Sequence, residues 1–119
     1  MDKIQMELFE QLTGLHEIPA GAYNIRANSK KDSRNTTANI DIVTKEDKDG
    51  IDIYVKPGTK NERVHIPVVI SKTGLEECVY NDFHIGEGAD VLIVAGCGIH
   101  NGGGKKTRHD GINTICIWK

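Results

Sequence analysis

The first residues of the chain carry apolar side chains at helical spacing. The stripe consists of Ile4, Leu8, Leu12 and Leu15, with Met1 and Phe9 beside it. Asp2 followed by Gln5 is suited to a capping box, and Gly14 to a C-terminal cap. We therefore predict a helix over residues 2–13 that packs on the body of the protein. A helix that docks on a partner is the alternative.

From Ile18 onward the period of the apolar positions changes to two, which is typical of strands. The pattern predicts a strand over 22–28 and a polar loop over 28–37. It then predicts two strands, 38–47 and 51–58, joined by a turn at Lys48-Asp49-Gly50. In the second of these, Ile51, Ile53 and Val55 point one way, and Asp52 and Tyr54 point the other.

Three further strand segments follow. In residues 63–71 the side chains on one face are Val64, Ile66, Val68 and Ile70. Pro67 lacks a backbone donor, so its position is expected to be a sheet edge, a bulge or a strand end. Residues 82–96 predict two short strands around Gly86-Glu87-Gly88, and residues 112–119 predict a last strand.

The expected fold is mostly β, with one N-terminal helix and about seven short β segments. Such strands, separated by turns that contain glycine, suit a sandwich, a small barrel or a β-solenoid. The run "IGEGADVLIVAG" favours the solenoid, because it resembles the corner of a parallel β-helix coil. We expect the helix to occupy residues 1–17 and the β domain residues 18–119.

Composition narrows the function classes. A chain of 119 residues fits one domain, and its net charge of −2 gives no footprint for nucleic acid or an anionic membrane. No apolar run approaches the ~20 residues that span a bilayer, and the N-terminus has no signal-peptide core. We expect a cytoplasmic protein whose three cysteines are reduced, and the odd number argues against a complete disulfide framework.

Cys97, His100 and His109 form a C-x2-H-x8-H pattern, and thiolate with imidazole suits zinc or iron. A structural zinc site needs a fourth ligand, which Cys78, His84 or Asp110 would have to supply. The alternative is a small buried cysteine with two polar loop histidines. The equal spacing of Cys78, Cys97 and Cys116 would stack them in a solenoid, but we favour coincidence.

The segment "GGGKKTR" resembles a phosphate nest but fails the P-loop pattern, since Lys106 stands where serine or threonine must bind magnesium. We expect an exposed turn and no binding of ATP. Cys97 beside histidines suggests a nucleophile pair, yet nothing in the sequence identifies an oxyanion hole or a substrate pocket.

Three stretches resemble the SufB/SufD family of iron–sulfur cluster assembly scaffolds. They are "IPAGAYNIRANS", "DGIDIYVKPGTKNERVHIPVVIS" and "VYNDFHIGEGADVLIVAGCGIHN…RHDGI", the last being the most specific. The resemblance runs from about Leu12 to Ile112. It implies a right-handed parallel β-helix, of which this chain holds the first coils and is apparently an N-terminal fragment. After Ile112 the chain departs from the family pattern with "NTICIWK".

The resemblance also implies partners and cargo. Family members pair with a SufB- or SufD-type paralogue and with the SufC ATPase, and clusters are assembled on the pair. Cys97, His100, Arg108, His109 and Asp110 match family motifs, which implies contact with iron or a transient cluster. We expect no enzymatic activity, no tightly bound cofactor, no stable SufC complex, and pairing through an open β edge. The alternatives are a small autonomous zinc- or iron-binding protein and a purely structural interaction module.

Overall fold

The computed structural model describes residues 2–13, 21–100 and 106–118 and is mostly β. A short helix, α1 (Lys3–Thr13), precedes the strands. The strands are β1 (Ala22–Ala27), β2 (Lys30–Asn35), β3 (Ile40–Thr44), β4 (Gly50–Val55), β5 (Lys60–Ile70), β6 (Glu76–Gly86), β7 (Asp90–Ile99) and β8 (Arg108–Trp118).

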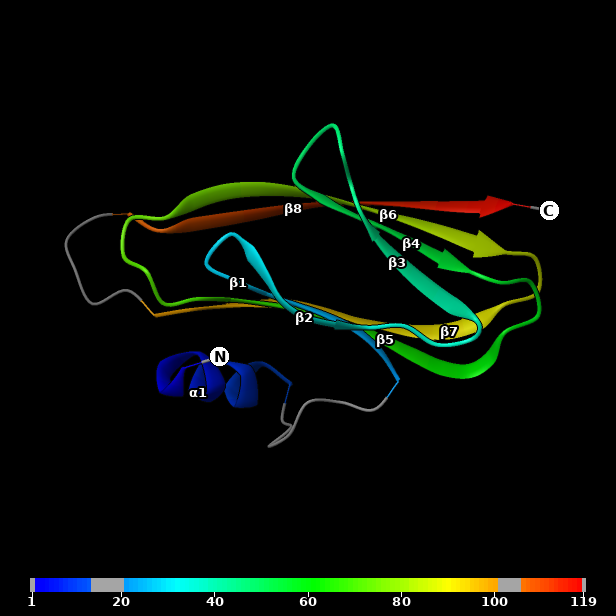
Figure 1. Ribbon diagram of the computed structural model, residues 1–119, viewed down its shortest axis with the longest axis horizontal. Coiled ribbons are helices and arrows are strands. Elements are labelled where there is room, and N and C mark those ends of the chain that lie inside the picture. Colours follow the sequence, from blue (N-terminus) through cyan, green and yellow to red (C-terminus); the bar gives the residue numbers. More distant parts are fainter. Residues whose placement is uncertain (1, 14–20, 101–105, 119) are drawn as a thin grey trace.

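The strands form two four-stranded sheets that face each other as layers (Figure 1). Their orders are β2-β1-β5-β7 and β3-β4-β6-β8. Each sheet begins with an antiparallel hairpin and continues with parallel strands. From β4 onward the chain crosses to the other sheet after every strand. Each later strand therefore pairs with the strand two before it.

The core lies between the sheets, and period-two alternation decides which side chains enter it. In β4, Ile51, Ile53 and Val55 are buried while Tyr54 is exposed, as the pattern predicted. The main cluster also contains Ala22, Ile40, Ile42, Val64, Ile66 and Phe83. A buried aliphatic side chain of this size contributes roughly 1.5–3 kcal/mol relative to an exposed one.

Helix α1 covers the outer face of the β1/β5/β7 sheet, which confirms that it packs on the body (Figure 1). The capping box is confirmed, with Gln5 N donating to Asp2 Oδ1 over 2.9 Å and Asp2 N donating to Gln5 Oε1 over 3.0 Å. The anchor is Phe9, fully buried against Ile25 and Val69.

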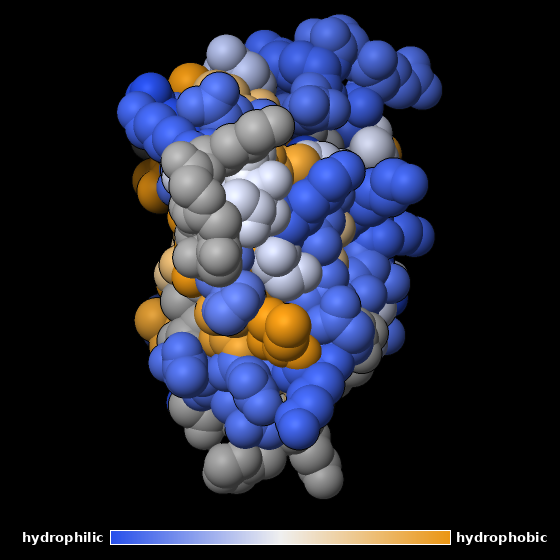
Figure 2. All heavy atoms as spheres, turned by 90° about the vertical axis from the view of Figure 1, so that its left-hand side faces the viewer, coloured by the Kyte–Doolittle hydropathy of each residue, from blue (hydrophilic) through white to orange (hydrophobic). Residues whose placement is uncertain are grey.

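The predicted stripe on α1 is wrong at Ile4, which is 43% exposed. The helix is rotated so that Gln5 and Phe9, one turn apart, face the sheet instead. The end of the molecule where α1 lies is mostly hydrophilic, with a small hydrophobic area in the lower half of Figure 2. Met1, Gly14 and Leu15 lie outside the described residues, as does the side chain of Leu12.

The predicted loop over 28–37 is wrong, because β2 occupies Lys30–Asn35 and pairs with β1. Asn28 and Ser29 have φ of 48° and 71°, the positive pair that a tight two-residue hairpin turn requires. The strand is polar and mostly exposed because it is the edge of its sheet. Polarity alone therefore concealed it, and the described strands number eight rather than seven.

Pro67 is not at an edge, a bulge or an end of its strand. It lies within β5, which has β1 on one side and β7 on the other. The β1 ladder is interrupted here, because its pairs pass from Tyr23↔His65 to Arg26↔Val68. The missing donor of Pro67 falls in this break, which removes the cost of an interior proline. Both faces of β5 are buried from Val64 to Ile70, one by the core and one by α1.

The last two strands are longer than predicted and leave aliphatic side chains uncovered. The exposed ones on β7 and β8 are Leu92, Ile99, Ile112, Ile115 and Ile117. The turn around Gly86-Glu87-Gly88 is confirmed between β6 and β7. In the part of the chain that the structure describes, no helix has the length and apolar character needed to cross a membrane.

Candidate functional site

The space between the sheets becomes polar at the end where β6 and β8 begin, on the left of Figure 1. Phe83 of β6 points into the core, so alternation also points Glu77 inward. Glu77 is paired in register with His109 of β8. The side chain of Glu77 is 3% exposed and that of His109 is 9% exposed. A buried carboxylate requires partners, and this one has four bonds.

The Glu77 cluster consists of Arg26, Ser29, Glu77 and His109. Oε2 of Glu77 accepts from Arg26 Nη2 over 2.9 Å, from Arg26 Nε over 3.2 Å and from Ser29 Oγ over 2.9 Å. Oε1 of Glu77 lies 2.7 Å from His109 Nδ1. Arg26 belongs to β1, so the cluster ties one sheet to the other. It joins groups 51 and 32 residues apart in sequence.

The charge of Glu77 is held in place by these donors. Burial alone would raise the pKa of Glu77, but the bonds from Arg26, His109 and Ser29 outweigh it and lower that pKa. The carboxylate is therefore ionised at neutral pH and acts only as an acceptor. It follows that Nδ1 of His109 donates its proton to Glu77, and a neutral ring then carries its lone pair on Nε2.

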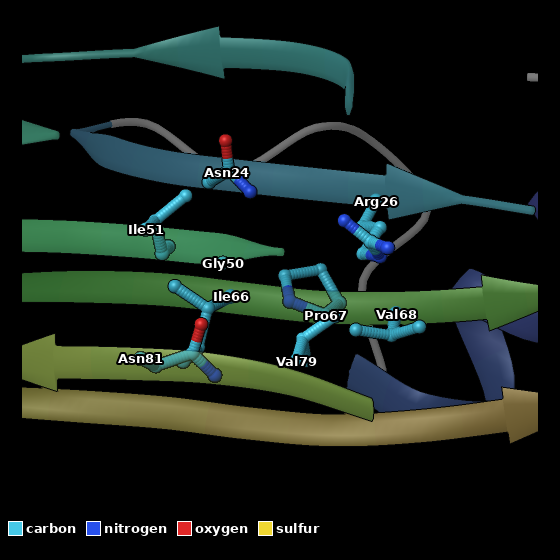
Figure 3. A pocket seen from close by; sticks show the side chains of 9 residues that line it. All are labelled: Asn24, Arg26, Gly50, Ile51, Ile66, Pro67, Val68, Val79 and Asn81. Carbon is cyan, nitrogen blue, oxygen red and sulfur yellow. The ribbon is translucent and has the colours of Figure 1, made fainter. Parts of the chain in front are cut away.

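Two cavities adjoin this cluster. The smaller, about 30 Å³, is seen in Figure 3 between β1, β4, β5 and β6, with Asn24, Arg26 and Asn81 on its wall. That is room for about one water molecule. The larger, called here the interior cavity, has a volume of about 240 Å³ and is partly open. Its lining includes Val68, Asn81, Cys97, His109, Gly111 and Asn113.

The structure brings together two of the three predicted metal ligands. Cys97 of β7 and His109 of β8 line the interior cavity from opposite sheets. His100 does not line it: the residue is exposed, and its backbone N–H donates to Ile70 O over 2.8 Å. Within the described ranges, no three His, Cys, Asp or Glu side chains are grouped as a metal site would hold them.

The other candidate ligands lie on the outer face of the β3/β4/β6/β8 sheet. Cys78 is exposed and paired in register with Asp110, while Cys116 is paired with His84. The cysteines therefore do not stack on one another, as the coincidence reading expected. Arg108 and Asp110, the other family-motif residues, form a half-exposed ion pair of 2.7 Å with each other. The glycines of "GGGKKTR" lie outside the described residues.

A second charged network lies on the same outer face. The ammonium group of Lys45 is 2.9 Å from Asp52 Oδ1 and 2.8 Å from Asp82 Oδ2, and its side chain is only 6% exposed. His84 Nε2 lies 3.1 Å from Asp52 Oδ1, and the ring stacks on Tyr54 with centroids 4.5 Å apart. Hydrogen bonds from Lys45 to Asp82 and Asp52 raise the pKa of the lysine.

Acid is expected to destabilise the protein through Asp52 and Glu77. Burial alone would raise the pKa of Asp52, but bonds from Lys45 and His84 outweigh it and lower that pKa. The folded pKa of both carboxyls is thus below the unfolded value of about 4. Their stabilisation is complete above that value and is lost as the pH falls through the folded pKa.

Urea unfolding at a series of pH values below about 5 measures this loss. Asp52→Asn should flatten the slope, whereas Asp47→Asn, at an exposed carboxylate, should leave it unchanged. An equal slope in the wild type and in Asp52→Asn would contradict the role of Asp52.

The sequence analysis missed Glu77 and Arg26. The signal for Glu77 was its parity: it shares the inward register of Val79, Asn81 and Phe83 in one strand. The same parity places Arg26 inward with Ala22 on β1. Two opposite charges at inward positions of predicted strands indicate a buried pair, although their pairing across the sheets has no local signal.

The chain was compared with family models, curated proteins and solved structures, and no match was found in any of the three.

Proposed function

We propose that this chain is part of a SufB/SufD-like scaffold for iron–sulfur cluster assembly, and that its sheets are successive coils of a right-handed parallel β-helix. The observation that carries the proposal is the coil register. Gly50 is paired with Tyr80, 30 residues later, and Tyr80 with Ile112, 32 residues later. In the other sheet Val64 is paired with Ile93, 29 residues later. Near-constant spacing between parallel neighbours is typical of a solenoid.

Side chains stacked on the inner face support the same proposal. Asn81 Nδ2 donates to Asn113 Oδ1 over 3.0 Å, one coil apart. Ile53, Phe83 and Ile115 occupy equivalent positions in β4, β6 and β8. The segment that resembles the family most specifically spans β6, the glycine turn and β7. The proposed scaffold acts without catalysing a reaction, and iron or a cluster is its cargo.

The proposed means of assembly is pairing through β8. Ile115 is 63% exposed and Ile117 is 72% exposed, and both lie on the inward-facing side of β8 near its end. Among the described strands, β8 pairs only with β6, so its other edge has free backbone donors and acceptors. A second solenoid of the same kind, a SufB- or SufD-type paralogue or a second copy, would cover both features.

Self-association is the expected result in solution. Sedimentation velocity over a range of concentrations should show a dimer or larger species, and Ile115→Lys with Ile117→Lys should shift the protein to monomer, since charge at an edge opposes strand pairing. Ile4→Lys with Val43→Lys is the matched control, because both residues are exposed hydrophobics elsewhere. A wild type that stays monomeric at every concentration, or a control that dissociates equally, would contradict pairing through β8.

A further inference from the structure

The orientation of His109 leaves one ring nitrogen directed at the interior cavity. Nδ1 is engaged by Glu77 at 2.7 Å, which turns Nε2 away from the carboxylate. Gly111, also on the cavity wall, lies beside Nε2: a Cβ at that position would be 3.6 Å from it. Glycine therefore keeps the approach to Nε2 open. A carboxylate that holds one imidazole nitrogen while the other is free is the usual arrangement behind a metal-binding histidine.

Cys97 faces the same cavity from the opposite sheet. It is half-buried on β7, where its register partner is Val68 of the inner face. Burial raises the pKa of the Cys97 thiol, and the negative charge of Glu77 raises it further, which places the thiol within electrostatic reach of the cluster. A thiol held protonated is a poor nucleophile. The cavity is thus better suited to binding through sulfur than to covalent catalysis.

The donor types decide which ion fits. Thiolate sulfur and imidazole nitrogen favour zinc, iron(II) and cobalt(II) over magnesium or calcium, which take oxygen ligands. Asn81 and Asn113 add amide oxygens to the wall of the cavity. Its volume of about 240 Å³ exceeds that of several water molecules at about 30 Å³ each, so an ion would retain bound water.

We propose that Sγ of Cys97 and Nε2 of His109 bind one divalent transition-metal ion, with zinc the best fit, and that Glu77 positions the imidazole. His100 is outside the site. The thiol releases its proton to solvent when it binds, and no electron is transferred. Two protein ligands leave at least two positions to water, to an asparagine oxygen or to an incoming ligand, so affinity is lower than at a four-ligand structural site. The proposal is independent of the scaffold function.

Cobalt(II) is the probe, added to the reduced, metal-free full chain under anaerobic conditions. We expect one cobalt per chain and a sulfur-to-cobalt charge-transfer absorption in the near ultraviolet. Cys97→Ser should abolish that absorption, and His109→Gln should weaken binding by more than about tenfold. Cys116→Ser and His100→Gln are the matched controls and should bind as the wild type does. Circular dichroism of each variant verifies that it is folded.

The positioning role of Glu77 has its own readout. Glu77→Gln keeps the shape and should weaken cobalt binding about 10–100-fold while leaving the sulfur-to-cobalt absorption of the saturated protein in place. If Glu77→Gln does not fold, His109→Gln and Cys97→Ser still decide the site. Cobalt binding by Cys97→Ser with its absorption intact, or no binding by the folded wild type, would overturn the proposal. Ile115→Lys with Ile117→Lys should keep the metal site, which separates its failure from that of the scaffold.

Discussion

Replacing Glu77 by alanine is expected to lower the free energy of unfolding by about 3–5 kcal/mol, the usual cost of removing one partner of a buried ion pair. Glu77 accepts from Arg26, Ser29 and His109, and its side chain is 3% exposed. Without it, the guanidinium of Arg26, 15% exposed, remains between the sheets with no carboxylate. Urea unfolding followed by circular dichroism measures the change.

Glu76→Ala is the matched control, since Glu76 is the exposed neighbour on the opposite face of β6, and it should change stability by less than about 0.5 kcal/mol. Combining Glu77→Leu with Arg26→Met should recover most of the loss, because an apolar pair carries no unpaired charge. A Glu77→Ala variant as stable as the Glu76→Ala control would show that the inter-sheet ion pair contributes nothing.

Replacing Gly50 by alanine is expected to cost about 3–4 kcal/mol, the sum of severe overpacking and backbone strain. Gly50 begins β4 with φ of 145°, and a Cβ there would overlap the carbonyl group of Tyr80 on the neighbouring strand β6. The two backbones would have to separate at Gly50↔Tyr80, the first pair of their parallel ladder. Thermal and urea unfolding of the variant measure the loss.

Gly88→Ala separates the two contributions to that cost. Gly88 has φ of 72° in the turn between β6 and β7, and a Cβ there would meet nothing within 4 Å. Its substitution should therefore cost only the left-handed strain of about 1–2 kcal/mol. If Gly50→Ala were no more destabilising than Gly88→Ala, close approach of β4 to β6 would not be the reason for glycine at position 50.

Some features follow from short stretches of chain because their causes are local. The capping box joins Asp2 to Gln5 within one helical turn. The alternation of Ile51, Ile53 and Val55 predicts the buried face of β4 because side chains of a strand point to its two faces in turn. The glycine turn between β6 and β7 is likewise a property of three adjacent residues.

What the sequence by itself determined is therefore the helix, most strands, their inward faces and two of the residues on the cavity wall, Cys97 and His109. Only the tertiary structure decided that β2 is an edge strand, that Pro67 lies opposite a break in the β1 ladder, and that Glu77 meets Arg26 and His109. These contacts join positions 32 and 51 residues apart. Hydropathy records which face of a strand is buried, but the side chains that meet across that face depend on how two sheets are registered against each other.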